Sequence, residues 1–242
     1  MNRVEPAIVV ALAPHGEHAV VGRFLSADQG LVAAYVQGGR GRKLRGVLQI
    51  GNRVALDLVI KSVGRLAFAA VHPIGTNMAM LHGPAALALV DYLASLAAAT
   101  LPEDAPQLRL FPLFDALFGG AAAGADPGDV GPALVRLELT LLAELGLGLD
   151  LASCAATGTT DDLAYVSPKS RQAVCRAAGL PWAAKLLPLP GFLLGHGAAD
   201  AAEIGEGLAL TGHFLVREVL LGGTAAKRAW TARERLVALL AR

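Results

Sequence analysis

The hydrophobic pattern of this chain changes its period once, near residue 75. Upstream of that point, apolar runs rich in β-branched residues recur between turn signals, as in half-buried strands, at residues 7–12, 19–25, 31–36, 54–63 and 66–71. Downstream, apolar side chains recur at the three- and four-residue steps of a helix, at Leu87, Val90 and Leu93 and again at Leu134, Leu137, Leu141 and Leu145. The sequence therefore predicts an α+β protein whose β domain precedes a helical body.

The five predicted strands match the strand number of an OB-fold barrel. Turn residues separate them at 15–17, 28–30 and 63–65. We therefore expect an OB-fold β-barrel domain over residues 1–76 and an all-helical domain over residues 77–242. In the helical domain, small and polar residues predict a loop at 121–131, and a serine-proline pair predicts a helix that starts at Ser167.

The apolar share of the chain, 54% of its residues, raises the question of a membrane span. The most apolar stretch, residues 85–99, is interrupted by Asp91 and is shorter than the roughly 20 residues that a span needs. We interpret it as a buried helix. No basic and then apolar leader opens the chain, because Glu5 and Pro6 break the first apolar run. These features predict a cytoplasmic protein.

The charge of the chain is unevenly distributed along the sequence. Residues 1–75 carry nine Lys/Arg and four Asp/Glu, residues 101–170 carry three and ten, and residues 171–242 carry nine and five. The net charges of these segments are therefore +5, −7 and +4. This pattern indicates that the two ends of the chain face a polyanion, although solvated faces that happen to segregate would explain it equally well.

A basic loop follows the third predicted strand. Its cations alternate with glycines and are Arg40, Arg42, Lys43 and Arg45. A mobile backbone of this kind could follow a phosphate chain while its side chains displace counterions, which predicts a nucleic-acid contact. The alternative is a solvated hairpin loop that is kept basic for solubility. We expect the barrel aromatics Phe24, Tyr35 and Phe68 to lie in the core, so that binding is electrostatic and indifferent to base sequence.

The two cysteines of the chain, Cys154 and Cys175, are too few for a disulfide framework. Each begins a four-residue segment, and cysteines in place of Thr157 and Ala178 would complete two C-x2-C knuckles separated by 17 residues. That spacing is typical of a four-thiolate zinc ribbon. Because only one thiolate of each pair is present, we expect a degenerate ribbon without metal, at residues 151–180. Two unrelated buried cysteines are the alternative.

The remaining candidates for catalytic or metal chemistry are weak. His15 and His18 form an H-x-x-H in a predicted turn, where a surface turn is the better interpretation, and Asp161 and Asp162 have no partner base. The sequence has no G-x-S-x-G nucleophile elbow. We therefore expect no cofactor and a binding protein rather than an enzyme. An enzyme with an unrecognised active site and an RNA-binding OB module remain as alternatives.

Several segments in order resemble one protein family. They are 137–146 with 149–154, then 164–169, the opening strands with the turn at 15–17, the basic loop, 48–52, 210–215 and 232–236. Together they resemble RecO proteins, in the branch of the family whose zinc ligands have been lost. The resemblance extends over nearly the whole chain.

The resemblance implies a mediator of DNA repair and homologous recombination in the RecF pathway. Such a protein binds single-stranded and duplex DNA, anneals complementary strands, and with RecR helps to load RecA onto DNA coated by single-strand-binding protein, in the cytoplasm at the nucleoid. The implied DNA contacts are the basic loop together with Arg23 and Arg53. The helical domain is implied to capture the acidic tail of single-strand-binding protein, with cations supplied by Arg217, Lys227, Arg228 and Arg233, although a solvated helix face explains these equally well.

Overall fold

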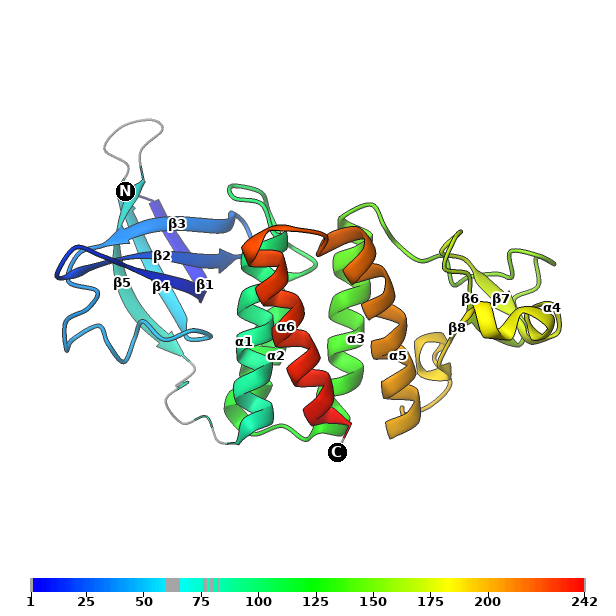
Figure 1. The fold of residues 1–242 in the computed structure, drawn as a ribbon. Coiled ribbons are helices and arrows are strands. Elements are labelled where there is room, and N and C mark those ends of the chain that lie inside the picture. The colour runs from blue at the N-terminus through cyan, green and yellow to red at the C-terminus, as the bar shows by residue number, and fades with distance from the viewer. Residues whose placement is uncertain (1, 60–65, 76–77, 79–80, 82, 242) are drawn as a thin grey trace. The chain divides into compact units, whose positions relative to one another are not determined.

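The computed structural model describes the chain except for residues 1, 60–65, 76–77, 79–80, 82 and 242 (Figure 1). It divides into two compact units. The first comprises Met1–Ala125 and Gly222–Leu239, and the second comprises Asp126–Leu221 and Leu240–Arg242. The α+β class is confirmed, because a five-stranded barrel precedes a helical region.

The barrel is closed and OB-like, with strand order β1-β2-β3-β5-β4. Its strands are β1 (Asn2–His15), β2 (Ala19–Ser26), β3 (Gly30–Val36), β4 (Arg53–Val59) and β5 (Ala67–Gly75). Strands β3 and β5 pair in parallel, and the other neighbours pair antiparallel. The predicted end of the fourth strand and the turn at 63–65 lie outside the described residues.

Alternation along the strands fills the barrel and leaves one face outside. In β2 and β3, the side chains of Phe24 and Ala34 are fully buried in the barrel core, whereas their neighbours Arg23 and Tyr35 are only partly buried. This is the two-residue period that the sequence shows. The placement of Phe24 in the core is confirmed.

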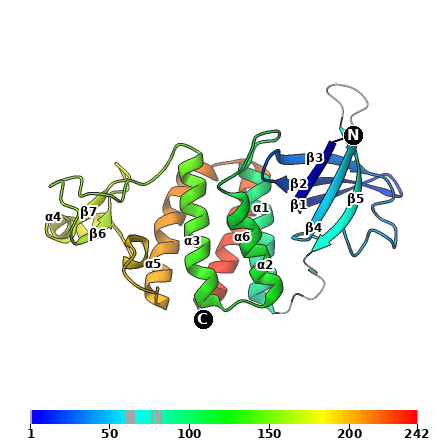
Figure 2. The same ribbon diagram turned by 180° about the vertical axis from the view of Figure 1, so that it is seen from behind.

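Three helices complete the first unit, namely α1 (Pro84–Thr100), α2 (Phe111–Ala123) and α6 (Gly223–Leu240) (Figure 2). Helix α1 follows Gly83, which has a φ of 85°, and it packs against α2 and β1. Its buried stripe contains Leu89, Leu93 and Leu96, whereas Leu87 is 52% exposed. The stretch at 85–99 is therefore a largely buried helix, although the predicted stripe was wrong at its first residue.

The second unit contains helices α3 (Pro127–Glu144) and α5 (Ala201–Phe214), which pack together. In α3 the leucine stripe is confirmed at 134, 137 and 141, where the side chains are fully buried. It was wrong at Leu145, which follows the last residue of the helix and is 39% exposed. The fully buried carboxylate of Glu138 in α3 accepts a hydrogen bond from Thr211 Oγ1 in α5. A five-residue π-helical turn, η4 (Leu215–Val219), continues α5.

A small three-stranded sheet lies between α3 and α5 in the sequence. It consists of β6 (Leu163–Val166), β7 (Ala173–Cys175) and β8 (Leu187–Pro188), with the short helices α4 (Arg176–Gly179), η2 (Leu180–Lys185) and η3 (Gly191–Leu194) beside it in sequence. The helix predicted to start at Ser167 was wrong, because Ser167 Oγ instead accepts from the backbone N–H of Ser170 in a turn. The loop predicted at 121–131 was too long, since α2 continues through its start and α3 occupies its end.

None of the helices in the described parts of the chain combines the length and the apolarity that crossing a bilayer requires.

Candidate nucleic-acid interface

The basic loop, residues 37–52 between β3 and β4, is a compact series of turns. Its apolar side chains face the barrel core, where Leu48 is buried and three others are partly buried, namely Leu44, Val47 and Ile50. The backbone N–H of Leu48 donates to the carbonyl of Leu44 at 2.8 Å. The loop is therefore anchored to the barrel and differs from the mobile segment that its glycines predicted.

Asn52 is a polar latch at the end of this loop. Its side-chain nitrogen donates to the carbonyls of Gly46 and Val47, each at 3.0 Å. Its side-chain oxygen accepts from the backbone N–H of Met78 at 2.9 Å. The side chain is 5% exposed, so its amide uses these protein partners in place of water. Sequence reasoning missed this residue, because a single asparagine carries no periodic signal.

The four cations of the loop are all exposed. Arg40 is tied to the β1–β2 turn, since its backbone N–H donates to the carbonyl of His18 at 3.1 Å and its Nη1 donates to that of Gly16 at 3.0 Å. No ion pair with a described acidic side chain is formed by the other three, which are Arg42, Lys43 and Arg45. An anchored backbone therefore presents three cationic side chains to solvent.

Arg23 and Arg53, by contrast, contact the segment that follows the barrel. Arg23 Nη2 lies 3.1 Å from Glu103 Oε1, and its Nη1 donates to the carbonyl of Ala98. Arg53 forms a two-point pair with Asp115 in α2, through Nε and Nη2. Because the charge of each guanidinium is matched by a carboxylate, both side chains serve contacts within the first unit.

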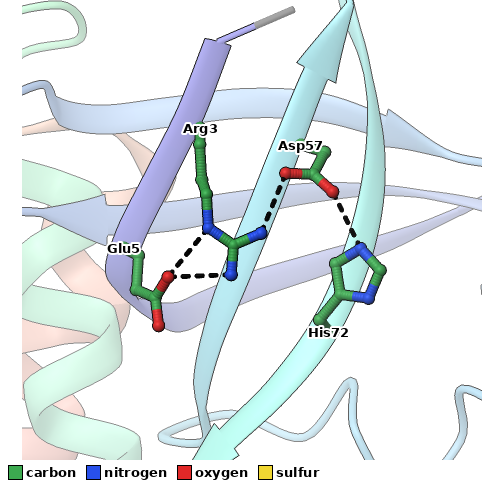
Figure 3. A network of polar contacts seen from close by, with 4 residues as sticks. All are labelled: Arg3, Glu5, Asp57 and His72. Carbon is green, nitrogen blue, oxygen red and sulfur yellow. Dashed lines mark hydrogen bonds and ion pairs between the residues drawn. The ribbon is translucent and has the colours of Figure 1, made fainter.

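A network of paired charges lies on the outside of β1, β4 and β5, in contrast to the unpaired cations of the loop (Figure 3). Arg3 contacts Glu5 at 2.8 Å and Asp57 at 3.2 Å, and Asp57 Oδ2 lies 3.0 Å from His72 Nε2. The hydrogen bond and charge of Glu5, and then the charge of Asp57, raise the pKa of the Arg3 guanidinium. The cation of Arg3 is therefore balanced on this face, in contrast to Arg42, Lys43 and Arg45, for which the described part of the barrel provides no ion pair.

The predicted core position was wrong for two of the three barrel aromatics. Phe68 is 37% exposed and Tyr35 is partly buried, with its hydroxyl donating to Gln37 Oε1 at 3.3 Å. Both belong to the outward register of their strands, since the neighbours Ala34 and Ala69 point into the core. The strand period does contain this information, but only once the inward register is known.

The predicted partner-binding cations have different surroundings. In the first unit, Lys227 is exposed, Arg228 Nη2 lies 3.2 Å from Asp91 Oδ1, and Arg233 is buried, with its guanidinium 5.5 Å from the ring centre of Trp230. In the second unit, Arg217 contacts Nε2 of another residue of its helix, His213, at 3.3 Å. Burial and then the charge of Arg217 lower the pKa of the His213 imidazole from its ordinary value.

The predicted ribbon region brings its two cysteines together. Cys154 Sγ accepts from the backbone N–H of Cys175 at 3.2 Å, and the hydroxyl of Thr157 lies 3.7 Å from Cys175 Sγ. Burial opposes ionisation of Cys154, but the hydrogen bonds from Cys175, Thr157 and Ala156 outweigh it and lower the pKa of this thiol to about 6.

This donor set does not fit a structural zinc ion. A hydroxyl occupies the position at Thr157, and Ala178 in α4 has no donor atom in its side chain, so two of the four thiolates of a ribbon are missing. Among the described residues, no group of three or more potential metal-ligating side chains comes together. Hydrogen bonds instead connect Cys175 with Cys154 and with Thr157.

Comparison with known proteins identifies the family. Residues 81–224 match the family model described as "Recombination protein O C terminal". The "DNA repair protein RecO" of Phenylobacterium zucineum is 45% identical over 218 residues, covering 89% of this chain and 88% of the relative. That of Paracoccus denitrificans is 43% identical over 235 residues, covering 97% and 94%, and that of Rhodospirillum rubrum is 42% identical over 218 residues, covering 88% and 86%. With an OB-like barrel before the matched helical region, this chain belongs to the RecO family of DNA repair proteins.

Proposed function

We propose that this chain is a mediator of DNA repair and homologous recombination in the RecF pathway, working without catalytic turnover. In this proposal it binds single-stranded and duplex DNA through the basic loop and anneals complementary strands. With RecR, it helps to load RecA onto DNA coated by single-strand-binding protein. Membership in a family of DNA repair proteins supports the general role.

The observation that carries the DNA-binding step is the anchored loop with its exposed cations. Arg42, Lys43 and Arg45 are held on a backbone that Leu48 and Asn52 fasten to the barrel. A cation that is already unpaired in the free protein gives up no internal ion pair when it meets a phosphate, and each phosphate contact releases a counterion from the nucleic acid. Arg40 lies at the same turn and adds a fourth charge.

Strand annealing by the purified protein tests this function. We expect faster pairing of two complementary strands, both bare and coated with single-strand-binding protein, without any nucleotide in the reaction. In the test variant, Arg42, Lys43 and Arg45 are replaced by glutamine. This variant should anneal strands slowly and keep the thermal unfolding midpoint of the native protein. Annealing at the uncatalysed rate by the native protein would rule the proposal out.

The capture of the acidic tail of single-strand-binding protein is a further part of the proposal. An apolar cavity of about 640 Å³ in the first unit is lined by side chains of β1, α1 and α6, and these include Arg228 and its ion-pair partner Asp91, whose place a carboxylate of the peptide would take. A cation beside an apolar cavity suits a peptide that ends in acidic and apolar residues. A synthetic tail peptide should bind the native protein and bind an Arg228→Glu variant more weakly. Equal binding by both would exclude Arg228 from the contact.

A further inference from the structure

The outside of the barrel carries a row of three aromatic rings from three different strands. The ring centres of His15 in β1 and Tyr35 in β3 lie 5.5 Å apart, and those of Tyr35 and Phe68 in β5 lie 5.1 Å apart. Tyr35 and Phe68 are direct register partners in the parallel pair of β3 and β5. His15 and Phe68 are exposed, and Tyr35 between them is partly buried. We call these three residues the aromatic row.

We infer that the aromatic row is a stacking surface for the unpaired bases of single-stranded DNA. The inference rests on the proposed function, because it assigns the base-contacting part of the same interface. The rings meet edge to face, at interplanar angles of 84° for His15 and Tyr35 and 62° for Tyr35 and Phe68, so each ring offers its own flat apolar face to a base. Aromatic rings on an OB-fold barrel, near the turns that connect its strands, are suited to stacking with bases. Every base has such a face, so this contact requires no particular base sequence.

The position of the row relative to the basic loop supports this assignment. His15 ends β1 immediately before Gly16, whose carbonyl accepts from Arg40 Nη1 at 3.0 Å. The backbone N–H of Arg40 also donates to the carbonyl of His18, in the same turn. One end of the aromatic row therefore adjoins the first cation of the loop. A single strand in which phosphates follow the loop can turn its bases toward the row.

The packing of the barrel core does not require these rings. The barrel core is filled by other side chains, including Phe24, Leu56 and Val36. Tyr35 and Phe68 contribute to the outer face instead, and aromatic side chains that gather on an outer surface are typical of a binding site. Because the bases of a duplex are already stacked and paired, the row should contribute to binding of single strands and contribute little to binding of duplexes.

The test compares two strands of equal length and charge, an oligothymidine and a strand whose sugars carry no bases. We expect the native protein to bind oligothymidine at least about fivefold more tightly, which corresponds to one stacked base. Replacing His15, Tyr35 and Phe68 together by leucine keeps the surface apolar and removes all three rings of the row. This variant should bind the two strands equally, with an unchanged dependence on salt.

The matched control is Trp182→Leu, which removes an aromatic ring that is 59% exposed in the second unit and should leave the preference intact. If the native protein binds both strands equally but with strong salt dependence, the stacking inference is wrong and the phosphate-binding proposal stands. A preference for oligothymidine that persists in the leucine variant also overturns the inference. If the native protein binds neither strand at low salt, both proposals fail.

Discussion

The side-chain amide of Asn52 donates to the carbonyl of Gly46, 3.0 Å away, and thereby closes the basic loop upon its own last residues. Gly46 directly follows Arg45, the last cation of the loop, and Asn52 directly precedes β4. One buried amide therefore connects the position of an exposed charge to the edge of the barrel. The loop is shaped by this contact as much as by its glycines.

Replacing Asn52 by leucine should weaken DNA binding without removing any charge. The substitution removes the donor for the carbonyls of Gly46 and Val47 and the acceptor for the backbone N–H of Met78. We expect the free energy of unfolding to fall by about 1–3 kcal/mol, because buried polar groups lose their partners. Urea unfolding and DNA titration of the same preparations measure both effects.

The control is Gln49→Leu, which removes a side-chain amide from the same loop. The Gln49 amide donates to the carbonyl of Arg45 over a long distance of 3.4 Å. This substitution should change both quantities much less. Equal stability of the native protein and the Asn52→Leu variant would show that the hydrogen bonds of Asn52 do not stabilise the loop.

Neutralising the exposed cations of the loop should reduce the salt dependence of binding to a single strand. Each phosphate contact contributes about 0.7 to the slope of log K against log salt. The variant in which Arg42, Lys43 and Arg45 are replaced by glutamine should therefore have a slope smaller by about 2. Fluorescence anisotropy over a range of salt concentrations measures it.

Arg3→Gln is the matched control for that measurement. It removes one cation from the same barrel, but that cation is already paired with Glu5 and Asp57 (Figure 3). The slope should stay close to that of the native protein. A slope that falls for Arg3→Gln and not for the loop variant would contradict the proposal, because the DNA would then bind the face that carries Arg3 and not the basic loop.

Thr211→Val should destabilise the second unit. Its hydroxyl donates to Glu138 across the packed helices α3 and α5, and both side chains are fully buried. Valine keeps the shape but removes this donor, so the buried carboxylate is less well satisfied, at a cost of about 1–3 kcal/mol. In the control Thr140→Val, the lost hydrogen bond reaches a backbone carbonyl of the same helix at a partly exposed position, and the change should stay within about 0.5 kcal/mol. Similar losses for both variants would contradict a special role of the buried pair.

The stability of the protein should contain a pH-dependent contribution from Cys154. Its pKa is lowered to about 6 in the folded chain, so between that pH and the ordinary thiol pKa the unfolded chain binds more protons than the folded one. This contribution is therefore fully present above the ordinary pKa and is lost as the pH falls toward 6. Its slope cannot exceed about 1.4 kcal/mol per pH unit, the value for one proton.

The measurement is urea unfolding under reducing conditions at several pH values, for the native protein and for Cys154→Ser. The difference in unfolding free energy between the two should grow in favour of the native protein as the pH rises from 6. A difference that does not change with pH would show that the thiol of Cys154 ionises as it does in the unfolded chain.

Periodicity alone was sufficient for the α+β class, the five strands of the barrel and the first three positions of the leucine stripe of α3. These features follow from local rules, since a strand repeats every two residues and a helix every 3.6. The same rules were wrong at Ser167, where hydrogen bonds within a turn replaced the expected helix. They were also incomplete at residues 121–131, because proline and glycine are tolerated in the first turn of α3.

The sequence by itself determined which residues carry charge, that the chain has only two cysteines, and where strands give way to helices. Only the tertiary structure decided which cations are available, because an ion pair joins residues far apart in the chain. Arg53 and Asp115, or Arg23 and Glu103, meet only when the barrel packs against the segment after it. It also decided that Tyr35 and Phe68 face outward, since the inward register of a closed barrel is set by how all of its strands pair.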